Sequence, residues 1–467
     1  MSTSTTVQTN SSNVVEEPIS LLQHELINSE FKISRSESNS RSFNFDLLKD
    51  HIPQSSIVSL DTPYSEALIS KALNEEISKI NYETCEPGAE DSFFVCDLGK
   101  IERLFKIWKQ SLPRVHPFYA VKCNPNPEVL KLLAKLGANF DCASKGEIEL
   151  ILSLGIDPSR IIYAHPCKVG SFLRFAQKQN VGMTTFDNAD ELYKIKKFHP
   201  NCKLLLRIIT DDESAQCRLS TKYGAPLSNV SNLLNLAKEL GLNIAGVSFH
   251  VGSGASDNES LIKAVHDSRN VFNIGRSMGF NMNTLDVGGG FSYESFDHAS
   301  KALSGALDKF FPVEYGVNII AEPGRYFVAN AFTLATHVIA RRGGIFDQQQ
   351  SDEPTMIYIN DGVYGNMNCI LFDHQQPEAH VLTNRDEFLF GELNQSSNDK
   401  FKVSIWGPTC DGLDCINKST YLSHNVVVGD WLYFPNLGAY TSAAASPFNG
   451  FKADANTVYI NSERYFV

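Results

Sequence analysis

Apolar runs alternate with amphipathic segments along the middle of the chain. Eight runs rich in β-branched or aromatic residues lie at 117–122, 140–143, 161–164, 183–186, 203–209, 244–251, 284–287 and 318–322. Segments with helical periodicity, such as 127–136, 145–154 and 227–240, separate them. This alternation is typical of a parallel sheet, and eight repeats match the size of a (β/α)8 barrel. A doubly wound open sheet is the alternative, and the count of eight favours the barrel.

The pattern changes on both sides of this region. The first part of the chain is rich in Ser, Thr and Asn, which predicts a disordered extension. After residue 331, short alternating runs between turn-forming residues predict an antiparallel β domain, a sandwich or an open barrel. We therefore expect a disordered extension at 1–55, a segment at 56–96 that joins the β domain in space, an α/β barrel at 97–331 and the β domain at 332–467.

Composition narrows the function further. The formal net charge of -12 at pH 7 disfavours a nucleic-acid binder, because such proteins need a basic face. The ten cysteines form no CxxC pair and no Cys/His cluster with zinc spacing, so we expect reduced thiols in a cytoplasmic protein without a metal site. No run of about 18 apolar residues and no secretory signal pattern is found, so we expect no membrane association.

Polar residues fall where the predicted barrel strands end, which is where barrel enzymes place their active sites. These residues are Lys122, Asp141, His165, Asp187, Arg207, His250, Gly288, Gly289, Gly290, Glu322 and Arg325. Because loops commonly begin with polar residues, part of this set needs no functional explanation.

Two of these features suggest specific chemistry. The glycines 288–290 would let backbone N–H groups approach a phosphate, and the fork-shaped guanidinium of Arg325 suits the same ligand. A tight turn with a surface arginine is the alternative. Lys122 has apolar neighbours, so it is a surface-reaching, an ion-paired or a Schiff-base lysine. Burial would lower its pKa and make it nucleophilic.

Five motifs occur together and in order: PFYAVKCN, HVGSG, DVGGG, AEPGR and WGPTCDGLD. With them, from about residue 92 to about residue 452, the chain resembles the eukaryotic, in particular the fungal, ornithine decarboxylases, a barrel-type (fold type III) pyridoxal-phosphate family. The last motif is the most telling, since the wider superfamily shares the others. The resemblance implies decarboxylation of L-ornithine to putrescine and carbon dioxide, the first step of polyamine synthesis, with pyridoxal 5′-phosphate as cofactor.

The resemblance also implies roles for single residues. Lys122 would hold the cofactor covalently, Glu322 would face its pyridine nitrogen, and His250 would stack on its ring. A carboxylate at that nitrogen keeps it protonated and makes the ring a strong electron sink. The implied phosphate ligands are Ser253, Gly288, Gly289, Gly290, Arg325 and Tyr440. The implied remainder of the cofactor site is Asp141, Glu147 and Arg207.

Substrate contacts follow from the same resemblance. Cys410 would return a proton to the α carbon, and Asp373 and Asp411 would bind the distal ammonium of the substrate. Cys410 and Asp411 are expected to reach into the other subunit, so the active form would be a homodimer with shared sites. The chain departs from the family at Phe372, where tyrosine is usual; we expect a modest effect on substrate contacts.

Two alternatives stay open. A decarboxylase of lysine or arginine would share the cofactor site, although the pair Asp373 and Asp411 favours a simple distal ammonium. A non-catalytic homologue that binds the regulator antizyme would be expected to lose cofactor or catalytic residues, and Lys122, Arg325 and Cys410 are present. An antizyme-type partner of an active enzyme is implied by the family alone.

Overall fold

A computed structural model describes residues 59–211, 219–252, 258–343, 353–391 and 400–463. The whole of the predicted extension at 1–55 therefore lies outside the described residues, as does Ser253. Among the described helices, none combines the length and the apolar composition that crossing a bilayer requires. Within the same residues, no group of three or more His, Cys, Asp or Glu side chains could hold a metal ion.

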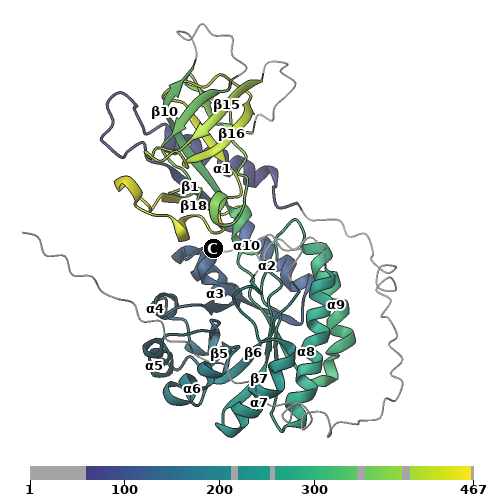
Figure 1. Ribbon diagram of the computed structural model, residues 1–467. Helices are drawn as coiled ribbons and strands as arrows, with labels where there is room; N and C mark the ends of the chain where they lie inside the picture. Colours follow the sequence, from purple (N-terminus) through teal and green to yellow (C-terminus); the bar gives the residue numbers. More distant parts are fainter. Residues whose placement is uncertain (1–58, 212–218, 253–257, 344–352, 392–399, 464–467) are drawn as a thin grey trace, which may run out of the picture. The chain divides into compact units, whose positions relative to one another are not determined.

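Eight parallel strands close into a barrel in chain order (Figure 1). They are β2 (Val115–Ala120), β3 (Asn139–Cys142), β4 (Ile161–Tyr163), β5 (Met183–Phe186), β6 (Lys203–Arg207), β7 (Asn243–Ser248), β8 (Thr284–Asp286) and β9 (Asn318–Ala321). Each coincides with one of the eight predicted runs. The closed barrel is thus confirmed, and the open sheet is excluded.

Eight helices accompany the strands on the outside of the barrel (Figure 1). They are α2 (Leu98–Ser111), α3 (Pro127–Leu136), α4 (Lys145–Ser153), α5 (Gly170–Lys178), α6 (Ala189–Phe198), α7 (Val230–Glu239), α8 (Glu259–Ser277) and α9 (Phe296–Phe310). Helix α3 shows why they form here. Asn126 caps its first turn, Pro127 supplies the fixed φ of the first position, and Gly137 ends it with a φ of 99°. Its buried face is Val129, Leu130 and Leu133.

The inside of the barrel is a packed core. Phe118, Ile162, Leu205, Ala245 and Ile320 come from five different strands and form one buried cluster. Side chains that point inward from parallel strands fill a barrel of this size completely. A ligand must therefore bind at an end of the barrel.

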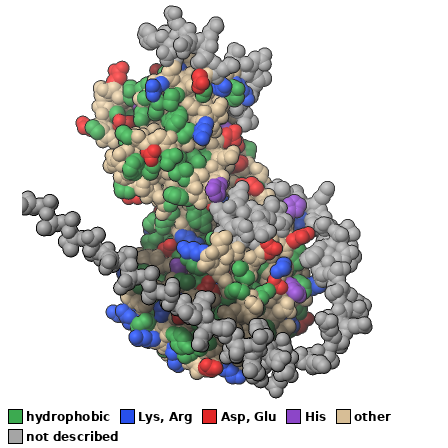
Figure 2. Space-filling view, viewed as in Figure 1, with side chains coloured by type: hydrophobic (Ala, Val, Ile, Leu, Met, Phe, Trp, Pro, Cys, Tyr) green, Lys and Arg blue, Asp and Glu red, His purple; other side chains and the backbone are tan. Residues whose placement is uncertain are grey.

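The second sheet has the order β12-β17-β10-β11-β15-β16, and β1 pairs with β10 and β18. Its strands are β1 (Phe93–Asp97), β10 (Phe332–Arg342), β11 (Thr355–Ile359), β12 (His380–Val381), β15 (Phe401–Trp406), β16 (Cys415–Leu422), β17 (Trp431–Phe434) and β18 (Asn456–Ile460). The predicted β domain is confirmed as mainly antiparallel, but the pairs β1–β18 and β11–β15 are parallel. On the face shown in Figure 2, hydrophobic side chains lie among charged ones on this domain. The predicted domain boundaries stay predictions.

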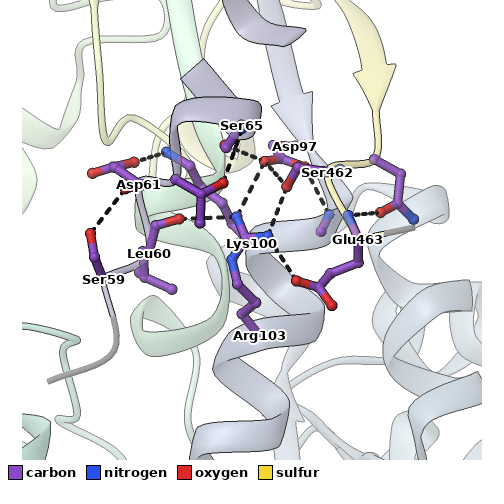
Figure 3. A network of polar contacts seen from close by, with 12 residues as sticks. Ser59, Leu60, Asp61, Ser65, Asp97, Lys100, Arg103, Ser462 and Glu463 are labelled. Atoms are coloured by element: carbon purple, nitrogen blue, oxygen red, sulfur yellow. Dashed lines mark hydrogen bonds and ion pairs between the residues drawn. The ribbon is translucent and has the colours of Figure 1, made fainter. Parts of the chain in front are cut away.

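A polar network joins the β domain to the barrel at the end of β1 (Figure 3). Asp97 is fully buried and accepts hydrogen bonds from Ser65 Oγ and Ser462 Oγ, each at 2.6 Å. It also caps α2 by accepting from Gly99 N at 2.9 Å. Arg103 binds Ser462 Oγ at 2.8 Å from the next turn of α2. One carboxylate therefore links helix α1 (Pro63–Ile77), the first barrel helix and the end of the described chain.

Candidate active site

A cavity of about 180 Å³ lies at the C-terminal ends of barrel strands β2, β7, β8 and β9. Seven of the residues predicted for the site line it: Lys122, His250, Gly290, Glu322, Arg325, Asp373 and Tyr440. The first five belong to the barrel, and the last two belong to the β domain. Both parts of the chain therefore contribute to one cavity.

Lys122 lies in a single 3₁₀ turn, Val121–Cys123, directly after β2. Its two neighbours are fully buried, whereas its own side chain keeps 41% of its surface because it faces the cavity. The ammonium group forms an ion pair with Asp141, a completely buried residue of strand β3. Of the three possibilities considered for this lysine, the structure shows the ion-paired one, with the side chain facing the cavity.

The pKa of Lys122 differs from the simple expectation. Burial lowers this pKa, as predicted, but the negative charges of Asp141 and Glu322 outweigh it, so that the net shift of the lysine pKa is upward. In the described state Lys122 is therefore an ammonium ion. Its amine becomes nucleophilic only after a proton leaves the cluster.

Glu322 follows β9 and is half-buried, because one side of it faces the cavity. Its backbone N–H donates to Gly288 O at 2.7 Å, which fixes it beside the glycine turn. Burial raises the pKa of Glu322 well above its usual value, and the neighbouring carboxylates Asp286 and Asp141 add to the shift. Asp286 was not among the predicted site residues.

The glycine triplet forms a turn that side chains would block. A Cβ atom on Gly288 would lie 2.2 Å from Phe249 O, and one on Gly290 would lie 2.4 Å from Gly252 O. Both have positive φ, 67° and 96°, which glycine adopts without strain. A Cβ on Gly289 would meet Glu322 O at 2.7 Å. The turn is thus packed against its surroundings, with backbone close to the cavity.

Cationic and hydroxyl donors surround the same corner. The Arg325 guanidinium lies 5.5 Å from the centre of the Tyr440 ring, and both side chains line the cavity. Tyr440 N donates to Cys123 O at 2.9 Å, which ties the β-domain loop to the turn that carries Lys122. Arg325 forms an ion pair with Asp373, the carboxylate expected to bind substrate. Sequence reasoning did not foresee this pair.

The remaining barrel residues support the cavity from the sides. His250 Nδ1 accepts a hydrogen bond from Gly252 N at 3.0 Å, and His250 O accepts one from Thr210 Oγ1 at 2.8 Å. Glu147 accepts from Ala143 N at 2.7 Å at the start of α4. Arg207 ends β6 and stands 5.3 Å from the Tyr223 ring centre. Burial raises the pKa of Asp141, and the charge of Arg207 is one of those that oppose this rise.

Three predicted residues of the β domain do not reach this cavity. Phe372 is 70% exposed, and Cys410 is exposed on the β domain with its N–H bonded to Asn449 Oδ1 at 2.9 Å. Asp411 accepts a hydrogen bond from the Tyr364 hydroxyl. None of the three lines the cavity of its own chain. Their predicted place in a partner's site is therefore a matter for proposal.

Fold and site together define a class: a barrel protein that places an ion-paired lysine, a carboxyl group, a glycine turn and an arginine around one cavity at the strand ends. The family model described as pyridoxal-dependent decarboxylase, pyridoxal binding domain, matches residues 98–329. The chain is 59% identical over 408 residues to the ornithine decarboxylase of Saccharomyces cerevisiae, covering 85% of this chain and 86% of that protein. It belongs to the family of pyridoxal-dependent decarboxylases.

Other members of the family are also similar. Antizyme inhibitor 2 of Xenopus laevis is 47% identical over 399 residues, covering 83% of this chain and 84% of that protein. The crystal structure of the Paramecium bursaria Chlorella virus arginine decarboxylase superposes with a TM-score of 0.75 at 36% identity, covering 84% of this chain and all of that one. Proteins with these different names share the fold, so the fold alone does not define the substrate.

The residues present fit pyridoxal phosphate as the family's cofactor. Lys122 supplies the amine, the glycine turn and Arg325 supply phosphate donors, and Glu322 supplies an inward carboxylate. One oxygen of Glu322, Oε1, is buried and has no hydrogen-bond partner among the described residues. A buried carboxylate oxygen without a donor is costly, and a protonated ring nitrogen would satisfy it.

Proposed function

We propose that the chain decarboxylates L-ornithine to putrescine and carbon dioxide, with pyridoxal phosphate bound at Lys122. The observation that carries the proposal is the cavity in which Lys122, Glu322, Arg325 and Asp373 meet. Similarity to an ornithine decarboxylase at 59% identity supports ornithine over the alternatives. Decarboxylation of lysine or arginine remains the alternative activity.

The cofactor contacts are assigned by chemistry. Lys122 holds the cofactor covalently, and Glu322 takes the ring nitrogen. The backbone of Gly288, Gly289 and Gly290, together with Ser253, Arg325 and Tyr440, takes the phosphate. When bound, the cofactor supplies an electron sink for the bond between the α carbon and the carboxylate. His250 covers the ring, and Asp141, Glu147 and Arg207 set the charge around Lys122.

The chain's own groups then handle protons and charge. Asp141 holds the displaced Lys122 ammonium in place, which keeps the lysine within the cavity throughout turnover. Asp373 and Asp411 bind the distal ammonium of the substrate and so fix its orientation. Cys410 gives a proton to the α carbon, a task suited to a thiol because its ordinary pKa lies near working pH. Phe372 offers a ring without the usual hydroxyl.

We also infer a homodimer with shared sites. Cys410 is exposed and outside the cavity of its own chain, so it can act on substrate only from a second copy. Large apolar side chains with more than a third of their surface exposed lie on the same domain: Leu371, Phe372, Leu413, Phe448 and Phe451. Exposed apolar groups of this kind are commonly covered by a partner.

A regulator of the antizyme type is proposed as a further partner, because the chain is 47% identical to an antizyme inhibitor. Co-purification with a purified antizyme would test it. A cytoplasmic location is proposed as well, supported by nine unpaired cysteines in the described ranges, which suit a reducing compartment. Imaging of the tagged protein would test the location.

The experiment that tests the function is release of carbon dioxide from carboxyl-labelled ornithine, lysine and arginine, with and without added cofactor. We expect release from ornithine at the highest kcat/KM, dependent on cofactor. The Lys122→Ala protein is the control; it should lose both turnover and the visible absorption of the bound cofactor. Faster release from lysine or arginine would transfer the assignment to that substrate, and no release from any would reject it.

A further inference from the structure

A second carboxyl group lies beside Glu322. Asp286 is the last residue of β8 and is completely buried. Its Oδ1 accepts a hydrogen bond from Gly288 N at 2.9 Å, the first glycine of the triplet. Strand β8 pairs with β9, and Glu322 follows β9 with its N–H bonded to Gly288 O, so the Asp286 and Glu322 carboxyl groups are neighbours at the same end of the barrel and their charges act on each other. Nothing in the sequence motifs had assigned a role to Asp286.

Two ionised carboxylates cannot satisfy each other at this buried place, because each is an acceptor only. A proton on one of them would supply the missing donor. One oxygen of each, Asp286 Oδ2 and Glu322 Oε1, is buried without a hydrogen-bond donor among the described residues. Two carboxyl groups that share a buried site favour holding one proton between them, because burial and mutual repulsion oppose the ionisation of both.

The charged groups that face Asp286 and Glu322 also indicate one bound proton. Three carboxyl groups, Asp141, Asp286 and Glu322, lie with two cations, Lys122 and Arg207. The cluster is left with one negative charge if all ionise, and one bound proton makes it neutral. Burial raises the pKa of Asp286 to about 7 and raises the pKa of Glu322 well above its usual value, which favours a proton on the pair near neutral pH.

We propose that Asp286 is a positioning residue of the cofactor site, which shares one proton with Glu322 and stores it for the ring nitrogen of the bound cofactor. The inference rests on the proposed function, because it assumes that Glu322 faces that nitrogen. The pair would give its proton to that nitrogen: the O–H bond would break as the N–H bond forms, and both side chains would be left as carboxylates.

If Asp286 had only a structural role, a different side chain could replace it. To hold the glycine turn, residue 286 needs only an oxygen that accepts from Gly288 N. An asparagine side chain has such an oxygen and the same shape, so Asp286→Asn keeps the turn. Its amide would donate to Glu322, which could then ionise without a shared proton. The substitution therefore separates the two roles.

Infrared spectra of the cofactor-stripped, full-length protein at pH 7 to 8 test the stored proton directly. We expect the wild type to show the carbonyl band of a protonated carboxyl group, and both Asp286→Asn and Glu322→Gln to lose that same band. Asp361→Asn is the matched control. Asp361 is also buried, but it accepts hydrogen bonds from Ser92, Asn366 and Gly362 and so needs no proton of its own. Replacing Asp361 should therefore leave the band in place.

Cofactor binding gives a second readout. Calorimetric titration of the stripped protein in buffers of different ionisation enthalpy measures the protons taken from solvent. Asp286→Asn should take up about one proton more than the wild type, because its pair no longer brings one. Circular dichroism establishes that each variant is folded, and should one variant not fold, the other gives the same comparison.

Absence of the protonated carboxyl band from the wild type, or its persistence in both variants, would overturn the proposal, as would equal proton uptake. Failure of the proposed function looks different. A protein that shows the band and its loss but releases no carbon dioxide from ornithine keeps the proton pair and loses only the substrate assignment.

Discussion

The ion pair between Arg325 and Asp373 predicts a competition within the site. Both side chains line the same cavity, and 18% and 11% of their surfaces remain exposed. If Arg325 binds the phosphate of the cofactor, it must release Asp373, which then becomes available to the substrate ammonium. Asp373→Asn removes the competing charge while keeping the shape of the side chain. We therefore expect the substitution to change cofactor and substrate affinity in opposite directions.

The magnitudes follow from the burial of the pair. A charge-assisted hydrogen bond contributes about 1.5–3 kcal/mol, and the cost of desolvating both groups reduces the net value to about 1–2 kcal/mol. Asp373→Asn should thus tighten cofactor binding roughly 5- to 30-fold. The substrate loses a charged partner worth about 1.5–3 kcal/mol, which should raise KM roughly 10- to 150-fold.

The assay is titration of stripped protein with pyridoxal phosphate, followed by visible absorption, together with KM for ornithine from carbon dioxide release. Asp411→Asn is the matched control, because Asp411 is bonded to Tyr364 and not to Arg325. It should weaken substrate binding without tightening cofactor binding. Cofactor affinity that is unchanged or weaker in Asp373→Asn, or that rises equally in Asp411→Asn, would refute the competition.

Three further predictions concern the shared site, the glycine turn and pH. Mixed dimers of Lys122→Ala and Cys410→Ala chains should regain partial activity that neither parent shows, and verified mixed dimers without recovery would contradict shared sites. Gly288→Ala should abolish cofactor binding, measured by absorption, because its Cβ would lie 2.2 Å from Phe249 O; Gly279→Ala, with open space around it, is the control. Because burial raises the folded-state pKa of Asp286 to about 7, the stability it contributes is present below pH 4 and is lost as pH rises through 7. The melting temperature of the cofactor-stripped protein should therefore fall more steeply with rising pH in the wild type than in Asp286→Asn. Parallel curves for the two proteins would exclude a contribution of Asp286 to this pH dependence.

Hydrophobic periodicity predicts the barrel strands well because most residues of each strand are buried and apolar. It does not predict where a strand ends. The runs 117–122, 244–251 and 318–322 continue past β2, β7 and β9, and the excess residues include Lys122, His250 and Glu322. These residues lie in tight turns whose backbone bonds, such as Glu322 N to Gly288 O, join loops distant in sequence.

Other features depend on contacts that no local pattern encodes. The ion pair of Arg325 and Asp373 joins residues 48 positions apart from different parts of the chain. The parallel pairing of β1 with β18 joins segments from opposite ends of the described chain. Asp286 did leave a signal, since an aspartate inside an apolar strand needs a partner. Its partner, Glu322, was recognisable only once the two strands were known to be neighbours.

The position of Lys122 depends on the β domain as much as on the barrel. Asn124 Nδ2 donates to Gly438 O at 2.8 Å, and Tyr440 N donates to Cys123 O at 2.9 Å, so one β-domain loop bonds the two residues that follow Lys122. A Cβ on Gly438 would lie 1.9 Å from Val328 O, which shows how closely that loop packs on the barrel. The same loop carries Tyr440, which lines the cavity. The β domain therefore both holds the turn of Lys122 in place and forms part of the cavity wall around its amine. A barrel without this loop would keep the lysine and lose the geometry that makes it useful.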